Sequence, residues 1–187
     1  MKKILLLICC VLLSWNASAL DMVGVKLADS VYLGSHNLVL NGAGIRTKFI
    51  YKIYVAALYL GEKTHVSEVA LNQIGEKRIA LHVLYDLSDE QMLHSFNEVM
   101  IANHHPAEMH ALEPQLKELT SIFHAVKAVK NGDVVVLDYL PGSGTQIYVN
   151  GLLKGTIPGA QFNHALLKIW LGDKPDQPNL KQQMLGL

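Results

Sequence analysis

The sequence predicts an α+β domain in which a large antiparallel sheet carries helices on one face. Strand-like segments fill the first half of the chain and return near its end, whereas helical periodicity is confined to the middle and the C-terminus. The pair Asn150-Gly151, between two short strand-like segments, is a strong signal for an antiparallel hairpin. The crevice between sheet and helices in such a domain is a common place for a small apolar ligand.

The first half of the chain is rich in β-branched, aliphatic and aromatic residues, and Gly34, Gly42 and Gly44 mark turns or bulges between them. Both alternating faces of residues 48–60 are largely apolar, which predicts a central strand covered on two sides. The predicted strands cover residues 22–26, 30–33, 38–41, 48–60 and 78–85, and a short helix covers 67–74.

The middle of the chain is predicted to form two amphipathic helices. Ser88 and Gln91 have the spacing of a capping box, so the first helix begins at this serine. After a break at 103–106, apolar residues recur at helical spacing from Leu112 to Val126, which predicts the second helix. We expect both helices to pack on one face of the sheet.

The last third of the chain is predicted to return to the sheet and then end in helix. A meander of three strands is joined by turns at 141–144 and at Asn150-Gly151. The predicted strands are 133–140, 145–149 and 152–156, followed by a helix over 160–171 and one or two further turns over 179–185.

Residues 1–19 have the three parts of a secretory signal peptide: Lys2 and Lys3, an apolar core, and the small residues Ala17-Ser18-Ala19 before the cleavage point. Cleavage after Ala19 leaves one domain over 20–187, which we expect in the periplasm or outside the cell. Charge or glycine interrupts every later apolar stretch before the roughly 20 residues that span a bilayer. No transmembrane segment is therefore expected after cleavage.

The composition narrows the classes of partner. Cys9 and Cys10 both lie in the signal peptide, so the mature chain is expected to fold without disulfides. Without Lys2 and Lys3 it holds fourteen basic and sixteen acidic residues, a formal charge near minus two. The basic residues are scattered, without a run that indicates nucleic acid or an anionic membrane as partner.

Arg46 is the sharpest candidate for a binding residue, because the chain has only two arginines against fourteen lysines. A guanidinium beside an apolar strand indicates either a structural ion pair or a site for an anionic head group. Tyr54 either supplies a hydroxyl to the same anion or is a core tyrosine bonded to the backbone. A straight strand separates Arg46 and Tyr54 by about 26 Å, so they share a ligand only if the chain bends sharply.

Other chemistry has weaker support in the sequence. His104, His105 and His110 lie close together, but their spacing does not place three ligands on one face, so no metal is predicted. The Gly-Ser-Gly at 142–144 lacks the flanks of a nucleophile elbow, and the Gly-Ala-Gly at 42–44 leads into a strand instead of a phosphate-binding helix. No catalytic residue and no cofactor are predicted.

Three segments resemble the chalcone isomerase-like family, in particular its secreted bacterial branch. They are Leu-Asn-Gly-Ala-Gly-Ile-Arg at 40–46, Lys-Ile-Tyr-Val-Ala-Ala-Leu-Tyr-Leu at 52–60 and Phe-Asn-His-Ala-Leu-Leu-Lys-Ile-Trp-Leu-Gly at 162–172. The resemblance implies an open-faced β-sandwich, with a large antiparallel sheet, helices packed on it and a cleft between them.

Family members that close chalcones into flavanones use an arginine after the Gly-Ala-Gly segment to hold the substrate oxyanion, and Arg46 occupies that position. The resemblance implies that the other catalytic groups are missing here, because the matching positions hold Tyr54, Met92, Val99 and Ile169. The plant fatty-acid-binding branch is the better analogue, since its members resemble this chain in pairing the arginine with a tyrosine in a Lys-aliphatic-Tyr strand, here Lys52-Ile53-Tyr54.

The predicted function is therefore that of a non-catalytic periplasmic binding protein for a fatty acid or a similar apolar carboxylate. The resemblance implies that Arg46 and Tyr54 clasp the carboxylate while apolar side chains hold the acyl tail. One alternative is an intramolecular lyase of the chalcone isomerase type, with Arg46 stabilising an oxyanion. Another is a structural or interaction module whose cleft is filled by side chains.

Overall fold

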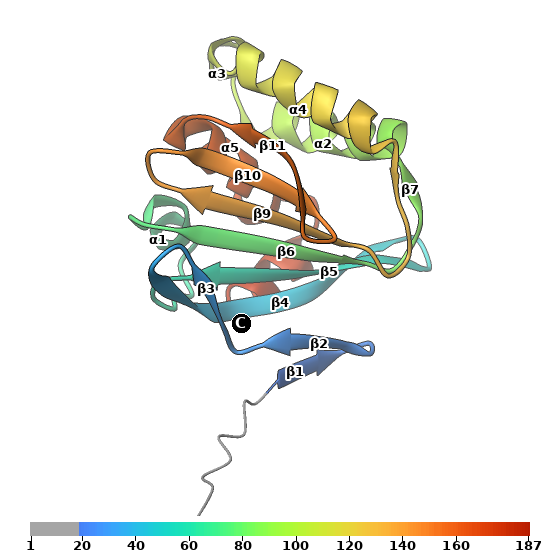
Figure 1. Cartoon of the computed structure of the whole chain (residues 1–187), viewed down its shortest axis with the longest axis vertical. Helices are drawn as coiled ribbons and strands as arrows, with labels where there is room; N and C mark the ends of the chain where they lie inside the picture. The colour runs from blue at the N-terminus through green and yellow to red at the C-terminus, as the bar shows by residue number, and fades with distance from the viewer. Residues whose placement is uncertain (1–18) are drawn as a thin grey trace, which may run out of the picture.

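A computed structural model describes residues 19–187, and its centre is a curled seven-stranded antiparallel sheet (Figure 1). The strand order is β11-β10-β9-β6-β5-β4-β3, so the strands from the two halves of the chain meet where β6 pairs with β9. The strands are β3 (Ser30–Leu33), β4 (His36–Lys48), β5 (Tyr51–Leu60), β6 (Lys77–Val83), β9 (Val134–Leu140), β10 (Gly144–Val149) and β11 (Leu152–Ile157).

Helices and two short strand pairs complete the fold. The helices are α1 (Ser67–Asn72), α2 (Asp89–Asn103), α3 (Pro106–Ala111), α4 (Glu113–Val126), α5 (Ala160–Leu171) and α6 (Pro178–Met184). The short pairs are β1 (Ala19–Met22) with β2 (Val25–Ala28), and β7 (Leu87–Ser88) with β8 (Ala128–Val129). No helix between residues 19 and 187 has the length and apolar character needed to cross a membrane. The predicted signal peptide lies outside the described residues, except for Ala19, which begins β1.

The sheet has a hydrophobic core on each of its faces, and β5 contributes to both. Tyr54, Ala56 and Leu58 pack with the helices, whereas Val55 and Ala57 pack in a second core that includes Leu27 of β2 and residues of β3 and β4. The prediction that this strand is covered on two sides is confirmed, and so is the predicted α+β class.

The predicted strand over 48–60 is wrong at its beginning, because β4 ends at Lys48 and a two-residue turn leads into β5. Of the turns or bulges predicted at Gly42 and Gly44, the bulge is present, because the β4–β5 ladder shifts register between Leu40 and Gly42, and no turn interrupts β4 at either glycine. The glycines are needed there because helix α6 packs against the strand. A Cβ atom on Gly42 would lie 2.3 Å from the carbonyl oxygen of Gln183.

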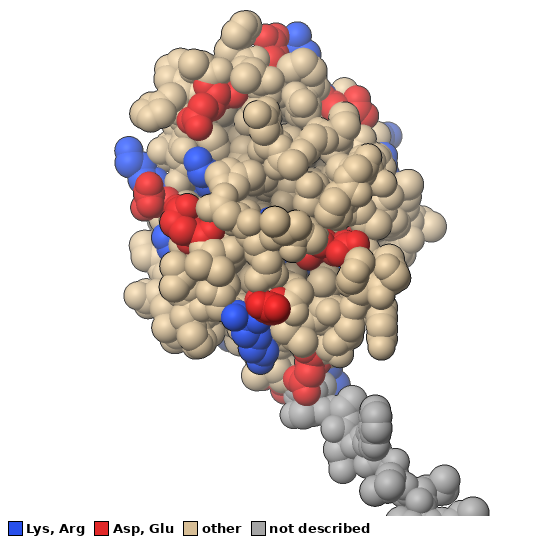
Figure 2. All heavy atoms as spheres, turned by 90° about the vertical axis from the view of Figure 1, so that its left-hand side faces the viewer, with Lys and Arg blue, Asp and Glu red and all other residues tan. Residues whose placement is uncertain are grey.

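Local signals at several other elements are confirmed. The Ser88 hydroxyl accepts a hydrogen bond from the Gln91 backbone, and the Gln91 side chain accepts one from the Ser88 backbone, so the capping box is complete. Asn150 and Gly151 both adopt positive φ in the β10–β11 turn. On the face of the molecule that carries α1, acidic and basic side chains are interspersed without a large area of one sign (Figure 2).

Candidate functional site

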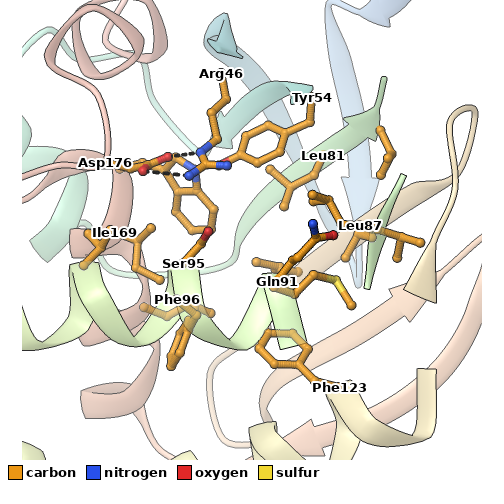
Figure 3. Close-up of a pocket in the computed structure, with 18 of the residues that line it drawn as sticks. Arg46, Tyr54, Leu81, Leu87, Gln91, Ser95, Phe96, Phe123, Ile169 and Asp176 are labelled. Carbon is orange, nitrogen blue, oxygen red and sulfur yellow. Dashed lines mark hydrogen bonds and ion pairs between the residues drawn. The ribbon is translucent and has the colours of Figure 1, made fainter. Parts of the chain in front are cut away.

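A pocket lies between the sheet and helices α2, α4 and α5 (Figure 3). Its volume is about 130 Å³, and its wall is almost entirely apolar. Met92, Phe96 and Phe123 line it from the helices, and Leu81 and Leu137 line it from the sheet. The charged and phenolic side chains of the wall are those of Arg46, Asp176 and Tyr54, which lie together in Figure 3.

Arg46 of β4 and Tyr54 of β5 are brought together by strand pairing. They are register partners across the two antiparallel strands, and the guanidinium carbon of Arg46 lies 5.6 Å from the centroid of the Tyr54 ring. The expected separation of about 26 Å is therefore wrong, because the chain reverses after Lys48 instead of running straight. Arg46 and Tyr54 could share a ligand only if the chain bends sharply between them, and the β4–β5 hairpin provides this bend.

Asp176, in the connection between α5 and α6, forms a two-point ion pair with Arg46 (Figure 3). Nε and Nη2 of the guanidinium donate to the two carboxylate oxygens, and the Nη2 to Oδ1 distance is 3.0 Å. The Arg46 and Asp176 side chains are 11% and 14% exposed, so the pair is largely withdrawn from water. Arg46 thus has one of its two predicted roles, that of a structural ion pair. It also lines the pocket.

Donors remain for a ligand at this end of the pocket. A guanidinium carries five N–H donors, and within residues 19–187 no acceptor is bonded to Nη1 of Arg46. The Tyr54 hydroxyl accepts a hydrogen bond from Nε1 of Trp170 at 3.0 Å. Its own proton is not donated to any group in the described part of the chain. Arg46 and Tyr54 can therefore both donate to one oxygen-bearing head group.

Burial and charge fix the protonation of the two donors. Burial lowers the pKa of Arg46, but the hydrogen bond to Asp176 and the negative charge of its carboxylate oppose this effect, and this pKa lies above its ordinary value. Burial raises the pKa of the Tyr54 hydroxyl far above its ordinary value, and the Arg46 charge offsets this only in part. The site presents a cation and a neutral phenol throughout the physiological pH range.

The sequence did not single out Asp176, Trp170 or Ser95, all of which line the pocket. A buried arginine needs a counter-charge, but sixteen acidic residues shared no spacing that distinguished Asp176. Trp170 lies in the helix predicted over 160–171, but no role in the site was assigned to it. Gln91 was identified as a capping residue, and the structure adds that it lines the pocket.

Arg78, the second arginine, has a different environment. It is the register partner of Asp138 across β6 and β9, and the two side chains form a two-point ion pair with distances of 2.5 and 2.7 Å. Neither residue lines the pocket. Both arginines of the chain thus pair with an aspartate, and the Arg46 pair lies at this pocket whereas the Arg78 pair does not.

The histidines do not form a metal centre in the described residues. Between residues 19 and 187, no three His, Cys, Asp or Glu side chains are grouped so that they could hold a metal ion. Nδ1 of His104 is hydrogen-bonded to the Met100 carbonyl oxygen at 2.9 Å. His105 is the N-cap residue of α3, where its backbone N–H donates to Glu108.

The fold and the site define a class: a curled antiparallel sheet whose helices cover an apolar pocket with one charged end. A family model described as chalcone isomerase-like matches residues 19–186, and the chain belongs to this family. A crystal structure of a fatty-acid binding protein from Arabidopsis thaliana is similar, with a TM-score of 0.71 and 14% sequence identity over 90% of this chain and 96% of that chain. At this identity the likeness shows the fold. No curated protein matches the sequence.

The predicted family and its fold are therefore confirmed. The positions that the resemblance assigned to missing catalytic groups also lie at the pocket, because Tyr54, Met92, Val99 and Ile169 all line it. Three of these four side chains are apolar and cannot transfer a proton.

Proposed function

We propose that this protein is a non-catalytic binding protein for a fatty acid or a similar apolar carboxylate. The carboxylate accepts hydrogen bonds from Nη1 of Arg46 and from the Tyr54 hydroxyl, and the acyl chain lies along the apolar wall made by α2 and α4. The observation that carries the proposal is a pocket with apolar walls and one charged end, where two donors have no acceptor among residues 19–187.

Asp176 has a direct consequence for binding. Arg46 and Asp176 together are neutral, so a second carboxylate would leave one negative charge without a partner in a largely buried site. Asp176 lies in the connection between two helices, where its side chain can turn toward water when a ligand carboxylate binds beside it at Nη1. In the absence of ligand, Asp176 then acts as a resident carboxylate that satisfies Arg46.

The size of the pocket restricts how an acyl chain is held. A closed cavity of about 150 Å³ accommodates one benzene molecule. The pocket of about 130 Å³ therefore holds only part of a long acyl chain unless the wall moves. Met92, Val99 and Phe123 are only partly buried, so this side of the wall is the one that yields.

Two further observations support binding. The similar Arabidopsis thaliana protein is described as a fatty-acid binding protein. The alternative of a module with a filled cleft predicts that side chains occupy the space beside Tyr54, and a pocket borders this residue instead.

Displacement of a fluorescent fatty acid by dodecanoate, together with native mass spectrometry of protein purified from its own cells, tests the proposal. We expect retained acyl ligands and at least tenfold weaker dodecanoate binding by Arg46→Ala. Lys52→Ala is the matched control, because it removes an exposed cation near the same strand pair. The proposal fails if no apolar ligand is retained and Arg46→Ala binds dodecanoate as the wild type does.

We also propose that the protein acts in the periplasm, on the basis of the signal-like residues 1–19. Fractionation of the cells followed by N-terminal sequencing tests this location. The expected result is a periplasmic protein that begins at Leu20. A cytoplasmic protein that retains residues 1–19 would contradict it.

A further inference from the structure

The turn between β4 and β5 exposes two large apolar side chains to water. Phe49 is 92% exposed and Ile50 is 88% exposed, and the lysines on either side of them, Lys48 and Lys52, are exposed as well. We propose that this turn is a membrane-docking tip that inserts Phe49 and Ile50 into the surface of a bilayer containing anionic lipids. The inference rests on the proposed function, since it assigns the route by which an apolar ligand reaches the pocket.

The backbone of the turn gives the first argument. Phe49 has a φ of 56°, in the left-handed region where a bulky side chain is an outlier. Two-residue hairpin turns favour glycine, asparagine or aspartate at such positions. A phenylalanine there costs conformational energy, and its exposed ring makes little contact with the protein to offset this cost. A role in binding outside the protein would explain why a phenylalanine stands at position 49.

Aromatic residues beside the tip give the second argument. Tyr51 and Tyr85 are 50% and 42% exposed, and their ring centroids lie 5.1 Å apart. Tyrosine is enriched at the level of lipid head groups, because its ring is apolar and its hydroxyl is polar. The tip thus carries Phe49 and Ile50, and two tyrosines lie behind them, as expected for a segment that enters the interface from one side.

Charge gives the third argument. Lys48 and Lys52 flank the apolar pair in sequence and extend from strands on both sides of the turn, where they can contact anionic head groups. The nearby Asp86 does not oppose this, because its carboxylate accepts from Nζ of Lys130 at 3.1 Å and from the Asn131 backbone at 2.8 Å. The hairpin thus brings Lys48, Lys52 and the apolar pair together in one patch. The sequence did not indicate this patch, because it contains no run of basic residues there.

The position of the tip connects it to the pocket. Phe49 follows Arg46 by three residues along an extended strand, a distance of about 10 Å. In Figure 1 the β4–β5 turn projects at the end of the sheet where β6 leads into β7. Val83 of β6 and Leu87 of β7 line the pocket. A bilayer that contacts the tip thus lies close to the charged end of the site.

Sedimentation with lipid vesicles tests the proposal. We expect the wild type to bind vesicles of phosphatidylcholine and phosphatidylglycerol more strongly than vesicles of phosphatidylcholine alone. The double variant Phe49→Asn/Ile50→Ser should bind the mixed vesicles at least tenfold more weakly, because two apolar side chains no longer leave water. Asparagine suits the left-handed backbone at position 49, so this variant is expected to fold. Lys48→Ser/Lys52→Ser should lose the preference for the anionic lipid.

Ile74→Ser is the matched control, because Ile74 is 98% exposed but lies between α1 and β6, away from the tip. It should bind vesicles as the wild type does. The proposal is overturned if the wild type does not bind mixed vesicles, or if Phe49→Asn/Ile50→Ser binds them equally well. It is also overturned if the tip mediates a dimer in lipid-free solution that this variant abolishes. Dodecanoate binding without vesicles is measured in parallel and should be unchanged in the tip variants, so that failure of the ligand proposal is recognised separately.

Discussion

Arg46 and Asp176 are 130 positions apart in the chain and meet in a two-point ion pair at the charged end of an apolar pocket. The pair joins strand β4 to the connection between α5 and α6, so it fastens the helical layer to the sheet. It also places a negative charge beside the guanidinium that an incoming carboxylate would contact through Nη1. Stability and ligand affinity are therefore linked through the same two side chains.

Removing the charge of Asp176 is expected to strengthen the binding of a fatty acid. In Asp176→Asn, Arg46 keeps its positive charge and the carboxylate that is paired with it no longer opposes the ligand. Two like charges about 5 Å apart repel by several kcal/mol at the effective dielectric of a protein surface. Dodecanoate should then bind about tenfold more tightly or better, as measured by displacement of a fluorescent fatty acid.

Two controls make this prediction specific. Asp173→Asn changes an exposed aspartate of the same connection and should leave dodecanoate affinity unchanged. Dodecanol carries no charge, so its affinity should not rise in Asp176→Asn. If wild-type protein binds dodecanol but rejects dodecanoate, and Asp176→Asn does the same, the ligand is not a carboxylate.

The same ion pair should show a strong coupling in stability. Arg46→Met leaves the carboxylate of Asp176 largely buried without its partner, and loss of one member of a buried pair costs about 3–5 kcal/mol. The double variant Arg46→Met/Asp176→Leu removes both charges and should lose less free energy of unfolding than Arg46→Met alone. Urea denaturation of the two variants and the wild type measures this difference. Equal losses would show that the unpaired charge is not the cause.

The elements that the sequence predicted correctly are those whose signals are local. The capping box at Ser88 and Gln91, the turn at Asn150-Gly151 and the helix over 160–171 each depend on residues near in sequence, and each is confirmed. The turn after Lys48 was missed because Phe49 and Ile50 look like strand residues. Their side chains prefer extended backbone, and only the pairing of β4 with β5 forces a reversal there.

The candidate site was predictable only in part for a related reason. Arg46 was identified because arginine is rare in this chain, and Tyr54 because it lies in a segment that resembles the family. Asp176 and Trp170 enter the site from the C-terminal part of the chain, and their contacts with β4 and β5 come from tertiary packing. No spacing within a single segment encodes such contacts, so the counter-charge of Arg46 had to come from the structure.

Gly42 should be intolerant of a side chain. A Cβ atom there would lie 2.3 Å from the Gln183 carbonyl oxygen, and that backbone belongs to helix α6. Gly42→Ala therefore has to push α6 away from β4, and overpacking of this kind costs about 1–3 kcal/mol. Gly61→Ala is the control, because its Cβ would meet only a side-chain atom at 3.5 Å. Thermal unfolding should show a lower melting temperature for Gly42→Ala alone, and equal shifts in both variants would contradict the close packing.

Two partly buried histidines predict how stability depends on pH. Burial lowers the pKa of His82, and burial together with Lys168 and Lys77 lowers the pKa of His164, both from 6.5. The unfolded chain thus binds more protons than the folded protein below about pH 6.5, so stability should fall as the pH drops through this range and stay level above it. His82→Gln/His164→Gln should reduce the loss of melting temperature on acidification, whereas exchange of the exposed His110 for Gln should not. An unchanged slope in the double variant would assign the acid sensitivity to other groups.

Chalcone cyclisation is expected to proceed no faster with this protein than without it. An intramolecular lyase needs a group that accepts or donates a proton near the substrate. Burial raises the pKa of Tyr54, so its hydroxyl stays neutral and can donate a hydrogen bond but is a poor base. Met92, Val99 and Ile169 line the pocket without any group that exchanges protons. Absorbance of a chalcone followed at neutral pH, with heat-denatured protein as control, measures the rate. Acceleration by the wild type that Arg46→Ala abolishes would favour the lyase alternative, because it would require the guanidinium to stabilise an oxyanion in the pocket.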